Sequence, residues 1–167
     1  MAPVTSLHAL RARALASSAL EGLAVGAVLA SRAAPPWSRP RVLTATAAGA
    51  LVAVDQLSLE LPAVLRELGA TGAVGQPPVH ERRALLHAGT RALGLGLLLQ
   101  VFDRPARAEL ARRGVAHPHR WFGLAAGLAH AAAVAPVYWR LGGERAAAEA
   151  ERDASIEAEL QAMAAGR

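Results

Sequence analysis

Four apolar stretches, each about the length of a membrane span, divide this chain, and each carries an ionisable side chain near its middle. These central residues are Glu21, Asp55, Arg91 and His130. A charge at the centre of a bilayer costs at least a few kcal/mol, so such residues are rare there and face protein or water. The four residues therefore predict a polar layer inside a helical bundle, which either holds the helices together or moves something between them.

The stretches cover residues 14–31, 42–65, 84–102 and 121–141. A helix of about 20 apolar residues spans a hydrocarbon core roughly 30 Å thick. We therefore predict an all-α fold, with an integral membrane four-helix bundle over residues 1–141 and an Ala/Glu/Arg-rich helical tail over residues 142–167. In the tail, Ile156, Leu160 and Met163 form a thin apolar stripe on an otherwise solvated helix, which could dock a partner weakly.

Two alternatives to four spans are open from the sequence. A soluble, Ala-rich helical bundle would also carry charges within its apolar stretches. The first stretch could instead be a signal peptide, because Arg11 and Arg13 precede it and residues 30–33 loosely resemble a cleavage site. Glu21 inside the stretch and Arg32 at its end both argue against cleavage, so we favour a retained first span.

Proline and glycine mark the expected connections and breaks. Three prolines within residues 33–41 forbid a helix through the first connection. Pro62 is expected to break the second stretch, whose later half is polar and so must face protein or a water-filled cavity. Residues 69–82 are expected to form the longest loop. Pro105 is expected to end the third stretch, with a separate short surface helix over residues 106–113.

The composition limits the classes of partner. All 18 basic residues are Arg, and the formal net charge is +5. Most of these arginines flank apolar stretches and aromatic residues are few, so membrane-flanking charge explains the surplus better than a nucleic-acid partner does. Arg without Lys, together with abundant Ala, Gly and Pro, indicates GC-rich bacterial coding. Cysteine is absent, which excludes disulfides and thiolate chemistry.

The arginines give little information on sidedness. The loops after the first and third stretches carry eight of them, and the opposite side carries seven near the ends of stretches. The positive-inside rule needs a larger difference than this. The long charged tail, without another export signal, favours cytoplasmic termini, so we expect a multi-pass protein of the cell membrane with both termini in the cytoplasm.

Small residues recur at every fourth position in two of the stretches. One ridge is Ser18, Gly22, Gly26 and Ala30 in the first stretch, and the other is Gly123, Gly127 and Ala131 in the fourth. Such ridges let two helix backbones approach closely, which favours association inside a membrane. We favour an intramolecular contact, in which the first stretch packs against the fourth or another stretch. A homodimer interface between two copies of the chain is the alternative.

Two carboxylates, a permanent cation and a titratable imidazole make up the predicted layer. Arg91 can pair with either carboxylate in forked geometry. His87 lies one turn from Arg91 on the same helical face, and Glu60 adds a carboxylate to the second stretch. One Arg cannot compensate two carboxylates, so one of them is expected to accept protons unless His130 is charged. The layer therefore fits either structural ion pairs or a proton-binding site.

Few residues suggest other chemistry. His87 and His130 lie in different stretches and could hold a haem between them, although hydrogen-bonded histidines are the commoner case. His117 and His119 have only Glu109 near them in the basic loop, which is too few ligands for a metal site. The chain contains no phosphate-binding Gly-rich loop, nucleophile elbow or metalloprotease motif. We expect no catalytic residues, no metal and no cofactor.

Three functions fit these features. The first, slightly favoured, is a non-enzymatic accessory or scaffold subunit that docks a membrane partner or further copies of itself through the ridges and the tail. The second is a proton-coupled small-molecule transporter that uses Glu21 or Asp55. The third is a haem or quinone redox protein of the membrane that uses His87 and His130. Under each of these three functions, we expect the protein to be embedded in the lipid bilayer.

Overall fold

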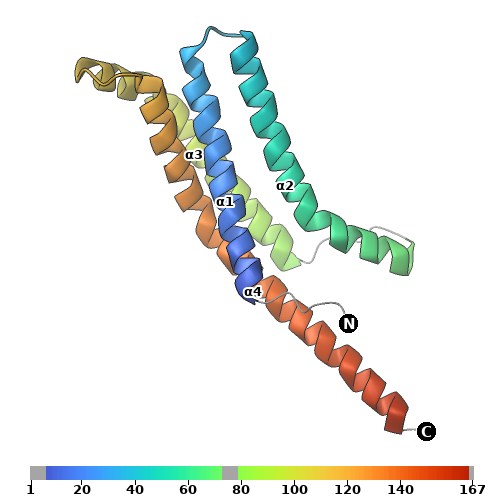
Figure 1. The fold of residues 1–167 in the computed structure, drawn as a ribbon. Coiled ribbons are helices and arrows are strands. Elements are labelled where there is room, and N and C mark those ends of the chain that lie inside the picture. Colours follow the sequence, from blue (N-terminus) through green and yellow to red (C-terminus); the bar gives the residue numbers. More distant parts are fainter. Residues whose placement is uncertain (1–6, 73–78, 166–167) are drawn as a thin grey trace.

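In a computed structural model the chain forms four long helices, and the structure describes residues 7–72 and 79–165 (Figure 1). Helix α1 is Leu7–Ala30 and continues into the 3-10 turn η1 at Ser31–Ala33; α2 is Arg39–Thr71, α3 is Val79–Arg112 and α4 is Pro118–Ala165. Successive helices run in opposite directions, so α1 begins at the same end of the bundle at which α2 ends (Figure 1). The described residues contain no strand, which confirms the all-α prediction for them.

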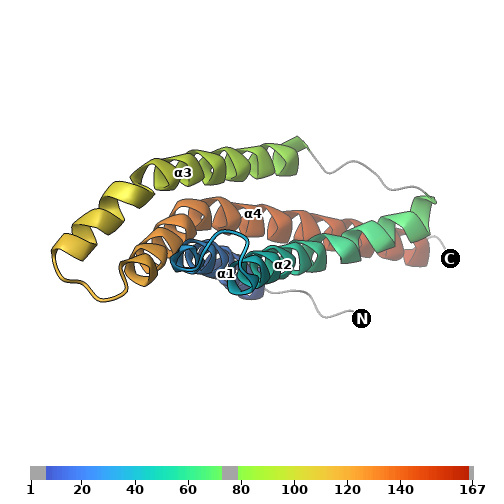
Figure 2. The same ribbon diagram turned by 90° about the horizontal axis from the view of Figure 1, so that it is seen from above.

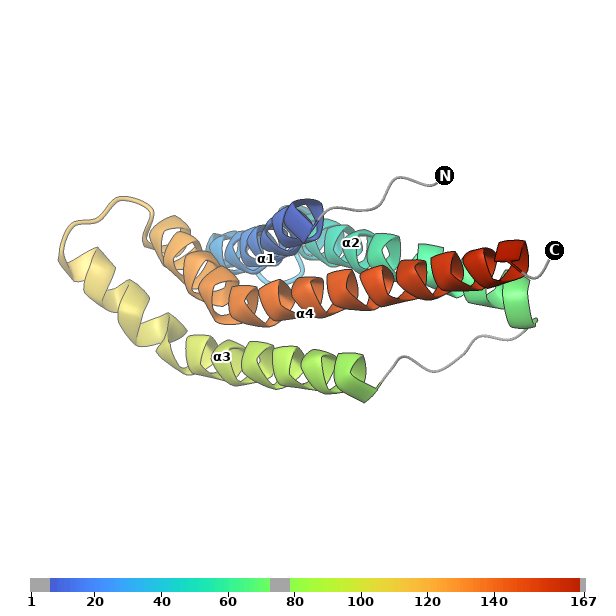
Figure 3. The ribbon, with the colours of Figure 1, turned by 90° about the horizontal axis from the view of Figure 1, so that it is seen from below.

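Helices α1 and α4 form the centre of the molecule and share its largest interface. Helix α2 packs on α1, and α3 packs on α4, as the views from above and below show (Figures 2 and 3). Over the described residues the backbones of α2 and α3 do not contact each other. The arrangement is therefore a central α1–α4 pair with two outer helices.

Glycines at the crossing of α1 and α4 let the two backbones touch. A Cβ atom built on Gly22 would lie 2.5 Å from the carbonyl oxygen of Gly127, and one built on Gly123 would lie 2.5 Å from that of Gly26. Any side chain at these positions would force the helices apart, because the obstacle is backbone. The two small-residue ridges thus pack against each other within one chain.

Proline does not end α3. The helix continues through Pro105 to Arg112, so the predicted end of the third helix at this proline and the separate surface helix over residues 106–113 are wrong. Proline removes one helical hydrogen bond and bends a helix, but contacts on both sides can hold the helix together. Here Arg107 donates from Nε to the carbonyl oxygen of Asp103 at 3.0 Å, and α3 bends in its last part (Figure 2).

Helix α2 is also longer than the apolar stretch that predicted it. It runs to Thr71 and bends in its second half instead of breaking (Figure 1). Gly72 ends it in a left-handed conformation, with φ of 71°, and donates its N–H to the carbonyl oxygen of Leu68 at 2.9 Å. The expected loop over residues 69–82 is therefore shorter at both ends, and residues 73–78 lie outside the described part of the chain.

The predicted tail is a continuation of α4. The helix passes through Gly142 and Gly143 without a break and reaches Ala165. Gly142 is the last buried residue, because its backbone packs against the carbonyl group of Leu10 in α1. Residues 150–165 are exposed throughout, and this part of α4 extends beyond the other helices (Figure 1).

Two segments of the described structure are long and apolar enough to cross a membrane, namely Leu7–Ala33 and Pro118–Ala165. The core helix of a soluble protein and a signal sequence meet the same criterion, so this is weak support for a membrane protein. Over their described residues, α2 and α3 do not meet it. The integral membrane bundle of four spans is therefore not confirmed.

Candidate functional site

A polar cluster lies where α1, α2 and α4 meet. The Glu21 carboxylate accepts hydrogen bonds at Oε1 from the Tyr138 hydroxyl at 2.6 Å and from Gln56 Nε2 at 3.1 Å. His130 Nε2 lies 3.4 Å from the other carboxylate oxygen, Oε2. Gln56 Nε2 also lies 3.4 Å from the Tyr138 oxygen. We call these four residues the Glu21 cluster.

The Glu21 cluster is largely closed to solvent and contains no guanidinium. The side chains of Glu21 and His130 are 13% and 8% exposed. Among the described residues, the partners of Glu21 are a hydroxyl, an amide and an imidazole. None of these partners is a permanent cation, so Glu21 and His130 form a carboxylate–imidazole pair without a fixed positive charge.

The close packing of α1 on α4 brings these groups together. Glu21 precedes Gly22, and His130 lies one turn after the Gly127 that Gly22 contacts. Tyr138 follows His130 by eight residues, which returns it to nearly the same face of α4. Gln56 reaches the site from α2, which packs on the other side of α1.

The second predicted carboxylate, Asp55, is paired with a different arginine from the one expected. Arg13 Nη2 lies 2.5 Å from Asp55 Oδ1 and donates to Ser58 Oγ at 2.7 Å and to the Asp55 carbonyl oxygen at 3.3 Å. The Asp55 side chain is only 5% exposed, and its Oδ2 has no hydrogen-bond partner among the described residues. The Arg13 guanidinium therefore supplies a positive charge directly beside the Asp55 carboxylate.

The remaining members of the predicted layer do not join it. Arg91 and His87 lie on α3 and are exposed, so the predicted pairing of Arg91 with Glu21 or Asp55 is not found. The physical reason is that α3 packs mainly on α4 and that Arg91 lies on an exposed face of α3. The side chain of Glu60 lies outside the described residues.

A small pocket adjoins the Glu21 cluster on the side where α1 begins. Its volume is about 40 Å³, and its lining includes Arg13, Ser17 and Tyr138. A single water molecule needs roughly 10–15 Å³ of such space. The Ser17 hydroxyl is buried and has no partner among the described residues. The pocket is therefore large enough for a water molecule, and it is bordered by both Tyr138 and the partly exposed Arg13.

A second buried cluster lies at the opposite end of the bundle. The Asp103 carboxylate binds Arg32 Nη1 at 3.0 Å and Arg107 at 2.7 and 2.8 Å, and Arg107 Nη1 lies 3.1 Å from His119 Nε2. Burial raises the pKa of Asp103, but the hydrogen bonds from Arg107 and Arg32 outweigh burial and set this pKa below its usual value. These contacts join η1 to α3 and the start of α4.

Two histidines lie near this end of the bundle, His117 and His119. Burial lowers the pKa of His119, and the adjacent Arg107 lowers it further, which keeps the imidazole neutral. His119 contacts Arg107, and His117 is exposed. Among the described residues no group of three potential ligands could hold a metal ion.

Sequence reasoning did not assign Tyr138, Gln56 or Arg13 to the site. Tyr138 lies near the end of the fourth stretch, where an interfacial aromatic residue would also be expected, and Arg13 flanks the first stretch, as membrane-flanking charge would. One available signal is that His130, Val134 and Tyr138 recur at every fourth position, as the glycines of the ridges do. No comparable signal exists for Arg13, because its contact with Asp55 depends on how α2 is rotated.

No family model matches this chain, and no curated protein or solved structure is similar to it. The function is therefore argued from the Glu21 cluster and from the outer surfaces of the helices.

Proposed function

We propose that this chain is a small, non-enzymatic, multi-spanning membrane protein that couples proton binding at Glu21 to the transport of a small molecule. The observation that carries the proposal is the difference between the two buried carboxylates. Asp55 is neutralised by Arg13, whereas Glu21 has only uncharged donors and one imidazole around it. A group that carries protons must change its charge, and Glu21 is the carboxylate whose surroundings allow this.

The outer surfaces of the helices support a lipid environment. Large apolar side chains point outward from every helix, with exposed fractions of 68% for Leu23, 67% for Leu43, 70% for Leu97 and 64% for Leu128. A soluble monomer rarely exposes large contiguous apolar patches. Apolar side chains on the outer faces of all four helices are what a four-span protein in a bilayer would show, and they argue against a soluble bundle.

His130 and Tyr138 give Glu21 a route for its proton. His130 Nε2 lies 3.4 Å from Glu21 Oε2, a contact through which a proton can pass between the two groups. On the other side, Tyr138 borders the pocket that leads toward Arg13. With the termini on the cytoplasmic side, as the charged tail favours, that pocket faces the cytoplasm.

An accessory or scaffold role is the second candidate, and the end of α4 favours it. Ile156, Leu160 and Met163 are 49%, 57% and 61% exposed, within a part of α4, residues 150–165, that is exposed throughout. A redox role through a haem or quinone has less support. It needs His87 and His130 to face one ligand, and His87 is exposed while His130 contacts Glu21.

Proton movement across liposomes tests the proposal. The purified protein and a Glu21→Gln variant would be reconstituted with a pH-sensitive dye inside, with valinomycin and potassium to clamp the membrane potential. After an external acid pulse, the internal pH should follow faster in liposomes with the native protein than with Glu21→Gln. Glu109→Gln is the matched control, since Glu109 is an exposed carboxylate paired with Arg113. Equal rates for the native protein and Glu21→Gln would overturn the proposal and leave the scaffold role.

A further inference from the structure

An open groove runs along α1 between α2 and α3 and ends at Arg32. We propose that this groove binds one acyl chain of an anionic phospholipid, whose headgroup lies at the arginine-rich end of the bundle. The inference rests on the membrane location in the proposed function but not on the proton chemistry of Glu21.

The groove exists because α2 and α3 stand apart. Its volume is about 580 Å³, and its walls come from all three helices; they are Ala24, Val25, Val28 and Leu29 of α1, Ala45, Ala48, Gly49 and Val52 of α2, and Gly96, Leu99 and Gln100 of α3. Small residues on the two outer helices keep it open. A Cβ atom built on Gly49 or Gly96 would meet nothing within 4 Å.

The length of the groove fits one acyl chain in one leaflet. Along α1 it extends from Ala24 to Arg32, nine residues inclusive, which corresponds to about 12 Å at 1.5 Å per residue. Half of a hydrocarbon core about 30 Å thick is about 15 Å. A chain lying in the groove would therefore start near the level of η1 and end close to the middle of the bilayer.

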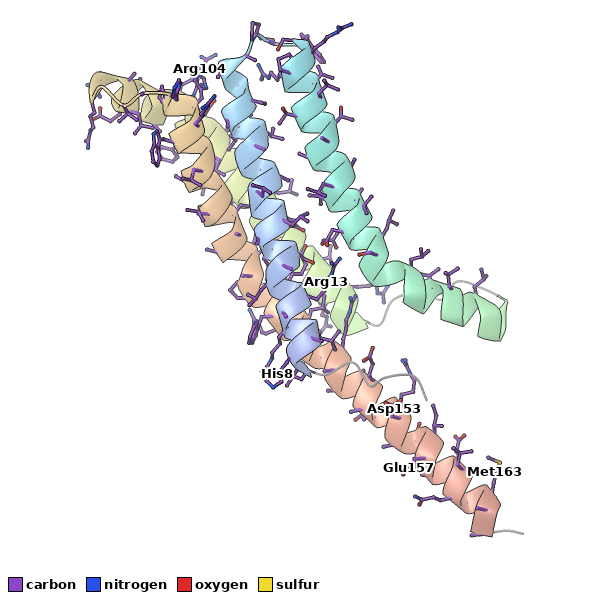
Figure 4. All side chains as sticks on the ribbon, in the orientation of Figure 1. His8, Arg13, Arg104, Asp153, Glu157 and Met163 are labelled. Carbon is purple, nitrogen blue, oxygen red and sulfur yellow. The ribbon has the colours of Figure 1, made fainter. Side chains whose placement is uncertain are left out.

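The end of the bundle at which the groove opens carries a surplus of positive charge. Eight arginines lie in η1, the start of α2, the end of α3 and the start of α4, namely Arg32, Arg39, Arg41, Arg104, Arg107, Arg112, Arg113 and Arg120. Only Asp103 and Glu109 oppose them within these segments, and each already binds two arginines. Figure 4 shows Arg104 at this end of the bundle.

Arg32 stands where the groove meets this charged surface. Its side chain is 23% exposed, and it bonds Asp103 through Nη1 and Gln100 through Nη2 at 3.0 and 3.1 Å. A guanidinium has five N–H donors, so Arg32 has donors left for a phosphate oxygen. A basic site between spanning helices selects anionic headgroups, while the ammonium group of a zwitterionic lipid would be repelled.

Native mass spectrometry of the full-length protein in detergent tests this inference. The protein would be mixed with dioleoyl phosphatidylglycerol or dioleoyl phosphatidylcholine at equal concentrations. We expect a one-to-one adduct with phosphatidylglycerol and about tenfold less with phosphatidylcholine, a ratio that corresponds to about 1.4 kcal/mol. Gly96→Leu and Gly49→Leu would fill the groove and should each remove most of the phosphatidylglycerol adduct.

Gly94→Leu is the matched control, because Gly94 also lies in α3 with open space around it but does not line the groove. It should keep the native adduct. Equal binding of both lipids to the native protein would overturn the inference. So would a phosphatidylglycerol adduct that is as abundant in Gly96→Leu and Gly49→Leu as in the Gly94→Leu control. Cell fractionation separates this failure from that of the proposed function: a chain found in the soluble fraction would remove both, whereas a membrane-bound chain without the adduct would remove only the lipid site.

Discussion

The hydroxyl of Tyr138 donates a 2.6 Å hydrogen bond to the Glu21 carboxylate and so links α4 to α1 inside the Glu21 cluster. Tyr138→Phe removes this donor and keeps the ring. Hydrogen bonds to charged groups contribute about 1.5–3 kcal/mol, so we expect a measurable loss of stability, seen as a lower unfolding temperature in detergent. Trp121→Phe, at an exposed aromatic residue of α4, should leave the unfolding temperature nearly unchanged. A Tyr138→Phe protein as stable as the native one would show that this bond does not hold the helices.

Replacing a glycine at the α1–α4 crossing and replacing a glycine with open space around it should have opposite effects on stability. Gly127→Ala places a Cβ 2.5 Å from the Gly22 carbonyl oxygen, so it should destabilise the protein by about 1–3 kcal/mol as the helices move apart. Gly94→Ala meets nothing within 4 Å and should stabilise α3 by about 0.5–1 kcal/mol, because alanine favours the helix. Thermal unfolding of both variants checks the signs. Destabilisation of similar size in both would contradict the close backbone contact.

The pairing of Asp55 with Arg13 predicts which arginine matters for stability. Removing Arg13 leaves the buried Asp55 carboxylate without its cation, but the Arg13 side chain is 41% exposed and water screens the pair, so Arg13→Gln should cost about 1–2 kcal/mol. Arg91→Gln should change stability by less than about 0.5 kcal/mol, since Arg91 is exposed. Denaturation by heat or by a harsh detergent compares the two variants. A larger effect of Arg91→Gln would restore the pairing that the sequence predicted.

Ion pairing of Asp103 predicts a loss of stability in acid. The pKa of Asp103 in the folded protein lies below the ordinary value of 3.8, because the bonds from Arg107 and Arg32 outweigh burial. The carboxylate therefore stabilises the fold above pH 3.8, and this contribution is lost as the pH falls through the lower folded pKa. Unfolding temperatures of the native protein and Asp103→Asn should differ at neutral pH and converge in acid. A difference that stays constant with pH would exclude this linkage.

The variant Glu109→Gln shows whether the convergence of unfolding temperatures in acid is specific to Asp103. Glu109 is also bound by two arginines, but its side chain is 38% exposed and water screens the pairs. Glu109→Gln should therefore have nearly the native unfolding temperature at every pH. If it converged with the native protein as Asp103→Asn does, the acid effect would reflect total charge and not the buried cluster.

Much of the helical arrangement could be predicted from the sequence, because it depends on local properties. Runs of apolar residues predicted four helices, and three prolines predicted the first connection. The ends of the helices were less accurate. Pro105 was taken as a stop, but in α3 the bonds of Arg107 to Asp103 on either side of it help to hold the helix together.

The sequence by itself determined that Glu21 and His130 stand at similar depths in antiparallel helices, and that glycines recur at every fourth position beside them. Only the tertiary structure decided which groups meet. Depth follows from position along a helix, whereas contact depends on how each helix is rotated about its axis. The glycine crossing sets that rotation for α1 and α4 and joins Glu21 to His130 and Tyr138. Helix α3 packs mainly on α4 and leaves Arg91 on an exposed face, while Asp55 pairs with Arg13.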